Sequence, residues 1–242
     1  NMIVRKSVNL SKQTHIIAAN IDQAILIITL QSPLTTTGFI DRFLVSAKAF
    51  GVEVILFFNK VDLYNKKLLS QKEKLMRVYS KIGYRCMSLS TLYDNMNEVK
   101  SIVKNKNNLI SGHSGSGKST LINKLLGNSN ILTKEISQRH DQGQHTTTFS
   151  ELYSLDFGGT IIDTPGIKGF GLVNIDLDRL SDFFPEFLSL KEGCKFNNCR
   201  HIKEPNCKVK EALEKNQISK DRYSNYLSML KTEESIYRTN NY

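Results

Sequence analysis

The chain has 242 residues, of which 40% are hydrophobic and 23% charged, which is ordinary for a globular protein with a sizeable core. Its 14 glycines and 4 prolines exclude a collagen-like or linker-like chain, and the longest apolar run near the start, Ala24 to Leu30, is too short to span a bilayer. The 33 Lys and Arg residues outnumber the 23 Asp and Glu residues, and the formal charge of +10 suggests a polyanionic partner.

Short apolar runs alternate with longer amphipathic stretches up to about residue 175. The runs are expected to form strands at 24–30, 52–58, 84–88, 108–111, 149–155 and 160–163. Helical spacing of apolar residues lies between them, at 39–50 and at about 70–82, 94–105 and 118–126. Alternation of this kind predicts an α/β fold whose mostly parallel sheet carries helices on both faces.

The pattern changes after about residue 175. No strand-like run follows, and a cluster of Cys and His residues separates two helical stretches, 177–190 and 208–237. Only one short strand-like piece, 2–4, precedes the alternating region. We therefore expect three parts, namely the end of a preceding domain or a linker at 1–12, the α/β domain at 13–175 and a small helical domain at 176–242.

Residues 112–119, with the sequence GHSGSGKS, match the phosphate-binding pattern G-x-x-x-x-G-K-[ST] between a strand and a helix. Glycines let the backbone wrap closely around phosphate oxygens, and the helix N-terminus adds partial positive charge. Lys118 is expected to reach the β- and γ-phosphates, and the Ser119 hydroxyl to bind Mg²⁺. The predicted nucleoside triphosphate site comprises Gly112, His113, Ser114, Gly115, Ser116, Gly117, Lys118, Ser119 and Thr120.

A base-recognition motif, Asn59-Lys60-Val61-Asp62, follows the strand expected at 52–58. Ligands of open α/β sheets bind at the carboxyl ends of strands, so this position favours a role in nucleotide binding. Asp62 can accept hydrogen bonds from N1–H and N2–H₂ of guanine, which would select GTP over ATP. Lys60 can lie along the base, and Asn59 can brace the phosphate loop.

A second candidate for base contact follows the strand expected at 84–88. This candidate is the segment Ser88-Leu89-Ser90, whose backbone N–H groups are predicted to contact the guanine O6.

Two further segments have the character of GTPase switches. Asp163-Thr-Pro-Gly166 follows the last expected strand, so Asp163 is predicted to hold Mg²⁺ and the Gly166 N–H to sense the γ-phosphate. In the segment 143–148, GQHTTT, Thr147 is our choice for the other Mg²⁺ ligand, with Thr146 as the alternative.

The residue that orients the attacking water is not the usual one. Ile167 stands where Ras-like enzymes place a glutamine, and it cannot hydrogen-bond a water molecule. His145 is therefore the candidate catalytic residue, as base or positioner, and a surface histidine is the competing interpretation.

Three cysteines and a histidine are closely spaced in Cys194-x₄-Cys199-x-His201-x₅-Cys207. Three thiolates and one imidazole suit tetrahedral Zn²⁺ and leave no open position, so this predicts a structural zinc site. Cys86 lies far away in the sequence and is expected to be a small buried hydrophobe.

The order of the motifs is unusual, because base recognition at Asn59 precedes the phosphate loop, the reverse of a conventional GTPase. The domain is therefore expected to be circularly permuted, which is tolerable where the original termini lie close together. Together with the zinc signature, this order resembles the RsgA (YjeQ/YloQ) family, and the match runs from about residue 5 to 237.

The resemblance implies a GTP hydrolase that acts late in the assembly of the small ribosomal subunit. It implies that His145 replaces the missing glutamine and that the zinc domain docks on rRNA. It also implies that GTP turnover is slow alone and is stimulated by the small subunit, and that hydrolysis sets the time at which the protein leaves the subunit. The family carries an N-terminal OB-fold barrel, of which residues 1–12 resemble only the end. No secretory leader is evident, so we expect a cytoplasmic protein without membrane attachment. We also expect it to be a monomer.

Two other functions are compatible with the motifs. One is a ribosome-binding assembly module in which GTP only sets conformation, and the other is a different P-loop enzyme such as an ATP-using kinase. The charge is uneven, since residues 60–106 hold 11 basic and 4 acidic side chains while 176–242 hold 12 and 11. If the positive charge binds RNA, the helical flank of the α/β domain carries much of it. The alternative interpretation is that these charges only solvate the surface of a helix.

Overall fold

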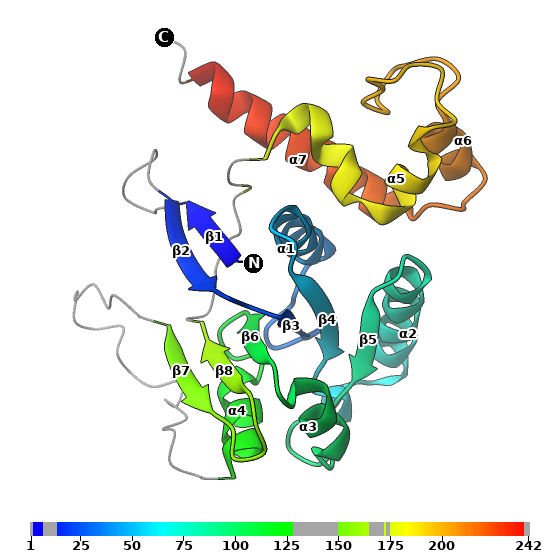
Figure 1. Ribbon diagram of the computed structural model, residues 1–242. Coiled ribbons are helices and arrows are strands. Elements are labelled where there is room, and N and C mark those ends of the chain that lie inside the picture. The colour runs from blue at the N-terminus through cyan, green and yellow to red at the C-terminus, as the bar shows by residue number, and fades with distance from the viewer. Residues whose placement is uncertain (1, 7–13, 128–149, 165–171, 173–174, 240–242) are drawn as a thin grey trace.

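Six strands form one sheet in the computed structural model, which describes residues 2–6, 14–127, 150–164, 172 and 175–239 (Figure 1). Their order across the sheet is β5-β4-β3-β6-β8-β7, and every neighbouring pair is parallel except β7 with β8. The mostly parallel α/β fold is thereby confirmed. The strands are β3 (Gln23–Ile28), β4 (Glu53–Phe58), β5 (Arg85–Ser88), β6 (Asn107–Gly112), β7 (Glu151–Ser154) and β8 (Thr160–Asp163).

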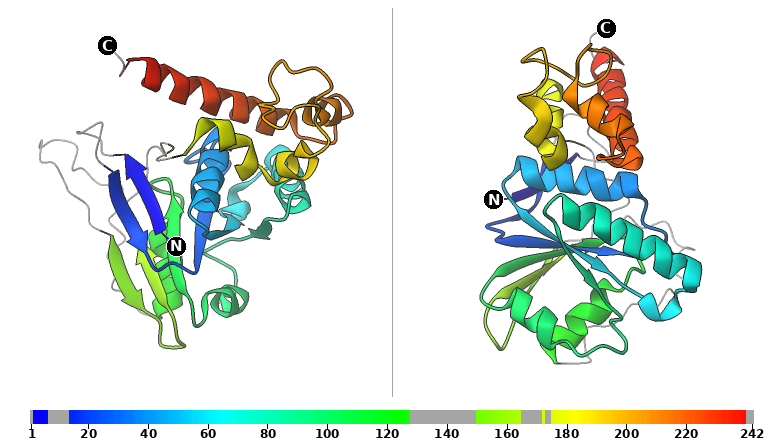
Figure 2. Two further views of the ribbon diagram at one scale, coloured as in Figure 1. Left: turned by 45° about the horizontal axis from the view of Figure 1, so that its top comes forward. Right: turned by 90° about the vertical axis from the view of Figure 1, so that its right-hand side faces the viewer.

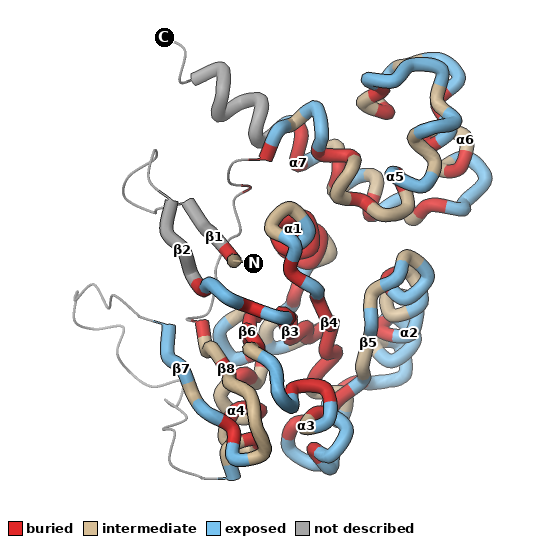
Figure 3. Tube along the Cα trace, in the orientation of Figure 1, coloured by how far each residue is buried: buried red, intermediate tan, exposed pale blue. Residues whose placement is uncertain are grey.

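Helices cover both faces of the sheet, as expected. Successive side chains of a strand point to opposite faces, so Leu26 and Ile28 pack with α1 (Thr37–Ala49) and α2 (Lys66–Lys81). On the other face, Ile25 and Ile27 pack with α3 (Asn97–Val103) and α4 (Lys118–Leu126). Every residue of β3 is buried, which places this strand at the centre of the core (Figure 3).

Side-chain caps set where α1 and α2 begin. The Thr36 hydroxyl accepts a hydrogen bond from the Phe39 N–H at 3.2 Å, and the Asn65 side chain accepts one from the Leu68 N–H at 3.0 Å. The apolar pattern of α2 starts only at Leu68, because the first two residues after the cap are lysines that face outward. These two lysines account for half of the difference of about four residues between the predicted start of α2 and the observed one.

The chain after residue 175 folds into helices that pack against α1. They are the 3₁₀ helix η2 (Leu177–Phe183), α5 (Pro185–Lys191), α6 (Lys208–Glu214) and α7 (Lys220–Thr239). The stretch predicted as one helix at 177–190 is divided, because Pro185 has no N–H to continue a helix and instead starts α5. Phe184, Phe187 and Tyr226 form the centre of this part, and Val45 of α1 belongs to the same cluster.

A small two-stranded sheet precedes the large one. The predicted piece at 2–4 lies within β1 (Met2–Lys6), which pairs antiparallel with β2 (Thr14–Ala19). No strand was predicted over β2. The division into three domains and the relation to an OB-fold remain predictions. Among the described helices, none combines the length and the apolar character needed to cross a membrane.

Candidate functional site

The phosphate loop lies between the end of β6 and the start of α4, as its sequence predicts. The ammonium group of Lys118 is held inside the loop, where its Nζ donates hydrogen bonds to the carbonyl oxygens of Gly112 and His113, each at 2.9 Å. Burial lowers the pKa of Lys118, and the nearby carboxylate of Asp163 opposes this effect. The site therefore holds a partly desolvated cation where phosphate oxygens are expected.

Two glycines of the loop occupy positions that a side chain could not share. Gly112 has φ +150°, and a Cβ there would lie 2.7 Å from the carbonyl oxygen of Ile27. Gly117 has φ +103°, and a Cβ there would collide with the side-chain nitrogen of Asn59. The glycines therefore allow the phosphate loop to approach β3 and the base-recognition motif closely.

Asn59 joins the base-recognition motif to the phosphate loop. Its Nδ2 donates to the carbonyl oxygen of Ser116 at 2.9 Å and to Thr91 Oγ1 at 3.3 Å, and its Oδ1 accepts from the Thr91 N–H at 3.0 Å. Asn59 is fully buried, so these bonds hold three loops together at the carboxyl edge of the sheet. Sequence reasoning found Asn59 but missed Thr91.

Asp62 lies on the short 3₁₀ helix η1 (Val61–Leu63), which follows β4. The Ser90 hydroxyl donates to Asp62 Oδ1 at 2.6 Å, and this bond orients the carboxylate. The Ser90 N–H donates to Asp94 Oδ2 at 2.6 Å, and the Leu89 N–H donates to the Phe58 carbonyl at 2.8 Å. Contact of these N–H groups with a base stays a prediction, whereas the Ser90 hydroxyl has a role that the sequence did not indicate.

A buried tyrosine, Tyr64, holds the backbone of the base-recognition motif in place. The hydroxyl of Tyr64 donates to the carbonyl oxygen of Asn59 and accepts from the Leu30 N–H, both at 2.7 Å. Lys60 adopts a left-handed conformation with φ +61°, and its Nζ donates to the Ser32 carbonyl at 2.5 Å. The only sequence signal for Tyr64 is a tyrosine shortly after the motif, which by itself does not indicate a function.

Asp163 ends β8 beside β6, where it pairs in register with Ile110. Burial raises the pKa of Asp163 to about 6, and the opposing effect of Lys118 does not cancel it. Its Oδ1 is buried without a hydrogen-bond partner among the described residues. Such a carboxylate oxygen fits a hard cation. Ser119 lies in the first turn of α4, directly after β6, and β6 pairs with β8, so two of the three predicted Mg²⁺ ligands come from neighbouring parts of the fold. The predictions for His145, Thr146, Thr147 and Gly166 lie outside the described residues.

The predicted metal ligands come together in a cluster. The donor atoms of Cys194, Cys199, His201 and Cys207 all lie within 4.8 Å of one another. His201 Nδ1 lies 3.3 Å from Cys207 Sγ and 3.7 Å from Cys194 Sγ, and these two sulfurs are 4.0 Å apart. Tetrahedral Zn²⁺ requires separations of about 3.6 Å between nitrogen and sulfur and about 3.8 Å between sulfurs. The cluster therefore has the size and chemistry of a zinc site.

Electrostatics of the cluster also favour a cation. Burial raises the pKa of Cys199 to about 12, so thiolates here need positive charge to offset theirs. Burial lowers the pKa of His201, which keeps the imidazole neutral and able to bind a metal. Cys86 lies apart from the cluster on β5, where it is half-buried against the core.

A buried ion network ties the metal-binding part to the α/β part. The guanidinium of Arg222, on α7, lies 2.5 Å from Asp41 Oδ1 of α1 and makes two bonds to Glu186 of α5, at 2.6 and 3.0 Å. Tyr79 of α2 donates to Asp41 at 3.0 Å, and Asn225 donates to it at 2.6 Å. Both carboxylates raise the pKa of Arg222 against the effect of burial, so the arginine stays charged.

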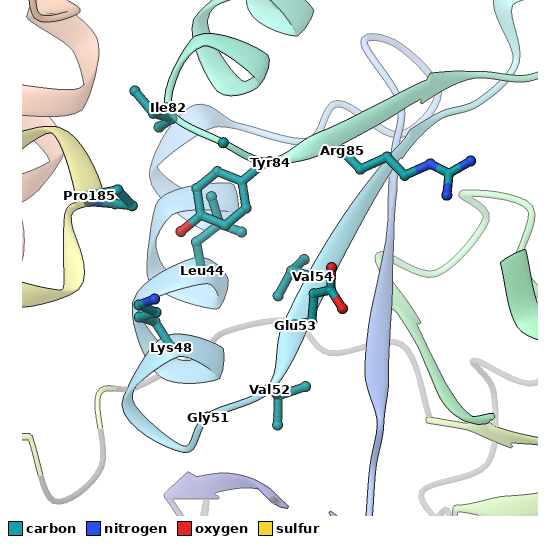
Figure 4. Close-up of a pocket in the computed structure, with 11 residues that line it drawn as sticks. Leu44, Lys48, Gly51, Val52, Glu53, Val54, Ile82, Tyr84, Arg85 and Pro185 are labelled. Carbon is teal, nitrogen blue, oxygen red and sulfur yellow. The ribbon is translucent and has the colours of Figure 1, made fainter.

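A pocket of about 490 Å³ lies at the opposite ends of β4 and β5, between α1 and Pro185 (Figure 4). Glu53 and Arg85 lie on its strand side, and Tyr84 points between the helices. None of the predicted site residues lines it. The residues predicted to bind the nucleotide therefore lie away from this pocket, at the opposite edge of the sheet.

Comparison with known proteins agrees with these features. The family model described as RsgA GTPase matches residues 1–173. The chain is 54% identical to "Small ribosomal subunit biogenesis GTPase RsgA" of Flavobacterium psychrophilum, over 100% of this chain and 74% of that protein. It is 48% identical to the protein of the same name in Bacteroides fragilis, over 98% and 77%.

Two solved structures resemble the fold. The crystal structure of YjeQ from Thermotoga maritima has a TM-score of 0.75 and 33% identity, over 95% of this chain and 74% of that chain. The structure of YloQ, described as a circularly permuted GTPase, has a TM-score of 0.72 and 25% identity, over 97% and 79%.

Proposed function

The chain belongs to the RsgA GTPase family and is a GTP-hydrolysing enzyme, and on that premise we propose that it assists late maturation of the small ribosomal subunit. The names of its relatives state biogenesis of the small ribosomal subunit. In this proposal the subunit stimulates hydrolysis of GTP to GDP and phosphate, and hydrolysis triggers release. The enzyme works as a cytoplasmic monomer that contacts rRNA.

The observation that carries the nucleotide assignment is the clamp around Asn59. Its bonds to Ser116 and Thr91 bring the base-recognition motif to the phosphate loop, although 57 positions separate Asn59 from Ser116. A guanine bound at Asp62 and a triphosphate bound at Lys118 can then belong to one nucleotide. The Ser90 hydroxyl presets Asp62 for the two donors of guanine, which adenine lacks.

Chemistry at the phosphates follows from the same loop. Lys118 binds β- and γ-phosphate oxygens and stabilises the charge that builds on them. Ser119, Asp163 and Thr147 (or Thr146) would hold Mg²⁺, which supplies further positive charge against these oxygens. Gly166 senses the γ-phosphate, and His145 orients or deprotonates the attacking water in place of the glutamine absent at Ile167.

The Cys₃His cluster holds one Zn²⁺ in a structural role. Support comes from the close approach of its four donor atoms. A fully ligated ion has no open position for substrate, so its contribution is to the folding of the loop that carries it.

The decisive experiment measures GTP and ATP turnover with and without purified small subunits, at two salt concentrations. We expect GTP turnover alone to be slow and the subunit to raise it, with the effect declining at high salt. Turnover that is indifferent to the subunit contradicts the proposal, and faster turnover of ATP indicates a different P-loop enzyme.

His145→Ala separates hydrolysis from a purely conformational role for GTP. We expect this variant to bind GTP normally and to lose the subunit-stimulated rate. Unchanged stimulated turnover would remove His145 from the catalytic role, and subunit release without hydrolysis would favour the conformational switch.

A further inference from the structure

The helix α2 carries an uncompensated line of positive charge on its outer side. It contains six basic residues and one acidic residue, Glu73. Glu73 forms an ion pair with Lys72, whose Nζ lies 2.9 Å from the Glu73 carboxylate. Lys66, Lys74, Arg77 and Lys81 are exposed, and none of them has an ion-pair partner among the described residues. We call these four residues the α2 ridge.

The ridge lies opposite the side of α2 that packs on the sheet. Leu68, Leu75 and Tyr79 point into the core beside α1, and at 100° per residue the four cations fall on the far side of the helix. From Lys66 to Lys81 the ridge extends over about 22 Å of helix axis. Arg77 and Lys81 are four residues apart, a like-charge spacing that weakens an isolated helix. The charge is therefore not explained by the stability of α2.

The last residue of the ridge contacts the helical C-terminal part. Lys81 Nζ donates to the carbonyl oxygen of Gln217 at 3.4 Å, in the turn between α6 and α7. Lys215 and Lys220 flank this turn and are exposed. Seen from the side of α2, that helix and the C-terminal helices face the viewer together (Figure 2, right). Exposed cations are thus present on both sides of this contact, although the exposed carboxylates of Glu214 and Asp221 stand beside Lys215 and Lys220.

We propose that the α2 ridge binds the phosphodiester backbone of RNA in the small ribosomal subunit. This inference rests on the proposed function and names the surface that carries out its RNA contact. Regularly spaced cations on a rigid helix can neutralise successive phosphates without reading base sequence. The outer side of α2 presents cations interspersed with the small polar residues Ser70 and Ser80. Leu69, at the edge of this side, is the one large apolar side chain of α2 that is exposed, and it is only 38% exposed. A single leucine is too little apolar surface for a helix that enters a lipid surface, so RNA is favoured over a membrane.

The test compares two triple variants of the full chain that lose the same charge. Lys66→Gln, Lys74→Gln and Arg77→Gln neutralise the ridge, and Lys100→Gln, Lys104→Gln and Lys106→Gln neutralise the opposite, α3 side. None of these side chains belongs to the nucleotide site, so basal GTP turnover and melting temperature serve as checks of folding. Binding to purified small subunits is measured across a series of salt concentrations.

Each lost phosphate contact lowers the slope of log affinity against log salt by about 0.7 to 0.9, so the ridge variant should lose about 2 to 3 in slope. Its affinity should fall most at low salt and converge with that of the unmodified chain as salt rises. The α3 variant should retain the original slope. An unchanged slope for the ridge variant, or an equal loss in both variants, overturns the proposal.

Two further arms identify the partner. A photo-cross-linking amino acid at position 74 should attach to RNA in the subunit, and attachment only to ribosomal proteins overturns the assignment. Loss of binding to anionic phosphatidylserine vesicles with unchanged subunit binding would identify a membrane surface instead. If subunits still stimulate turnover while the ridge variant keeps its slope, only the ridge assignment fails. If the unmodified chain neither binds subunits nor responds to them, the proposed function fails as well.

Discussion

Replacing Arg222 by methionine tests whether the buried ion network joins the two parts of the molecule. The Arg222 side chain is 3% exposed, and its partner Asp41 is fully buried. Methionine has a similar length but removes the charge. It leaves the Asp41 carboxylate in the core with hydrogen bonds from Tyr79 and Asn225 but without a cation.

The expected loss is large because an uncompensated charge remains buried. Removing one partner of a buried pair costs about 3–5 kcal/mol. For a chain of this size, each kcal/mol lowers the melting temperature by about 2–4 °C, so the shift should be roughly 6–20 °C. Arg222 also binds Glu186 with two hydrogen bonds, which places the expected loss toward the upper end of the range.

Denaturant unfolding of Arg222→Met, Arg222→Lys and the unmodified chain measures this loss. Lysine keeps the charge without the two-pronged geometry, so its loss should be intermediate. Adding Asp41→Asn to Arg222→Met should recover part of the stability, since the fully buried Asp41 charge is then removed and only the Glu186 carboxylate, 10% exposed, has lost its cation. The matched control is Arg179→Met, whose side chain is 70% exposed and whose pair with Asp182 spans 3.6 Å. It should lose no more than about 1 kcal/mol. A loss for Arg222→Met as small as that of this control would refute the reasoning.

Four other predictions address the site. Asp62→Asn should shift the ratio of xanthosine to guanosine triphosphate affinity by about 100-fold or more, because the amide presents a donor to the base edge; titration calorimetry measures it, and an unchanged ratio contradicts guanine recognition. Tyr64→Phe removes the hydroxyl that holds the Asn59 carbonyl, so it should lower the free energy of unfolding by about 1–3 kcal/mol and weaken GTP binding, whereas unchanged binding would confine the hydroxyl to a structural role. Burial alone would raise the pKa of Glu204, but hydrogen bonds from backbone N–H groups, including those of Arg200 and Ile202, outweigh burial and lower it. The resulting stability is present above the unfolded pKa of about 4.3 and is lost as the pH falls further, so Glu204→Gln should flatten the fall in stability below that pH, and an equally steep fall would exclude this carboxylate. Chelation should remove one zinc ion per chain and unfold the Cys₃His loop as followed by hydrogen exchange, and retention of protection after metal loss would contradict a structural zinc.

Local chemistry made much of the fold and site predictable. The central strands are buried on both faces, so each appears in the sequence as a continuous apolar run. The phosphate loop and the cysteine cluster need fixed residue types at short spacing, so Lys118, Asp62 and His201 could be assigned before any coordinates. In the described part of the chain, Lys118 begins the helix predicted after the phosphate loop, Asp62 follows β4, and His201 lies with the three cysteines of its motif.

What could not be predicted depends on contacts between distant segments. Arg222 and Asp41 are 181 positions apart, and nothing in either neighbourhood indicates the pair. Thr91 and Ser90 act through bonds to the base-recognition motif across a sheet edge, and serine and threonine are too common for such a role to be visible. The strand β2 was missed for a related reason, because its pairing with β1 and not a strong internal pattern defines it.

The helix α1 belongs to both parts of the molecule. At its N-terminal end Phe39 lies against the ring of His113 in the phosphate loop, with centroids 4.2 Å apart. Farther along, Asp41 and Val45 are buried against the helices that follow residue 175. The helix is 13 residues long, or about 20 Å, and has no proline at which to bend. A boundary at 175 therefore divides the chain but not the packing. The single helix α1 contacts both the phosphate loop and the metal-binding part, so these two parts cannot reorient independently unless α1 itself is displaced.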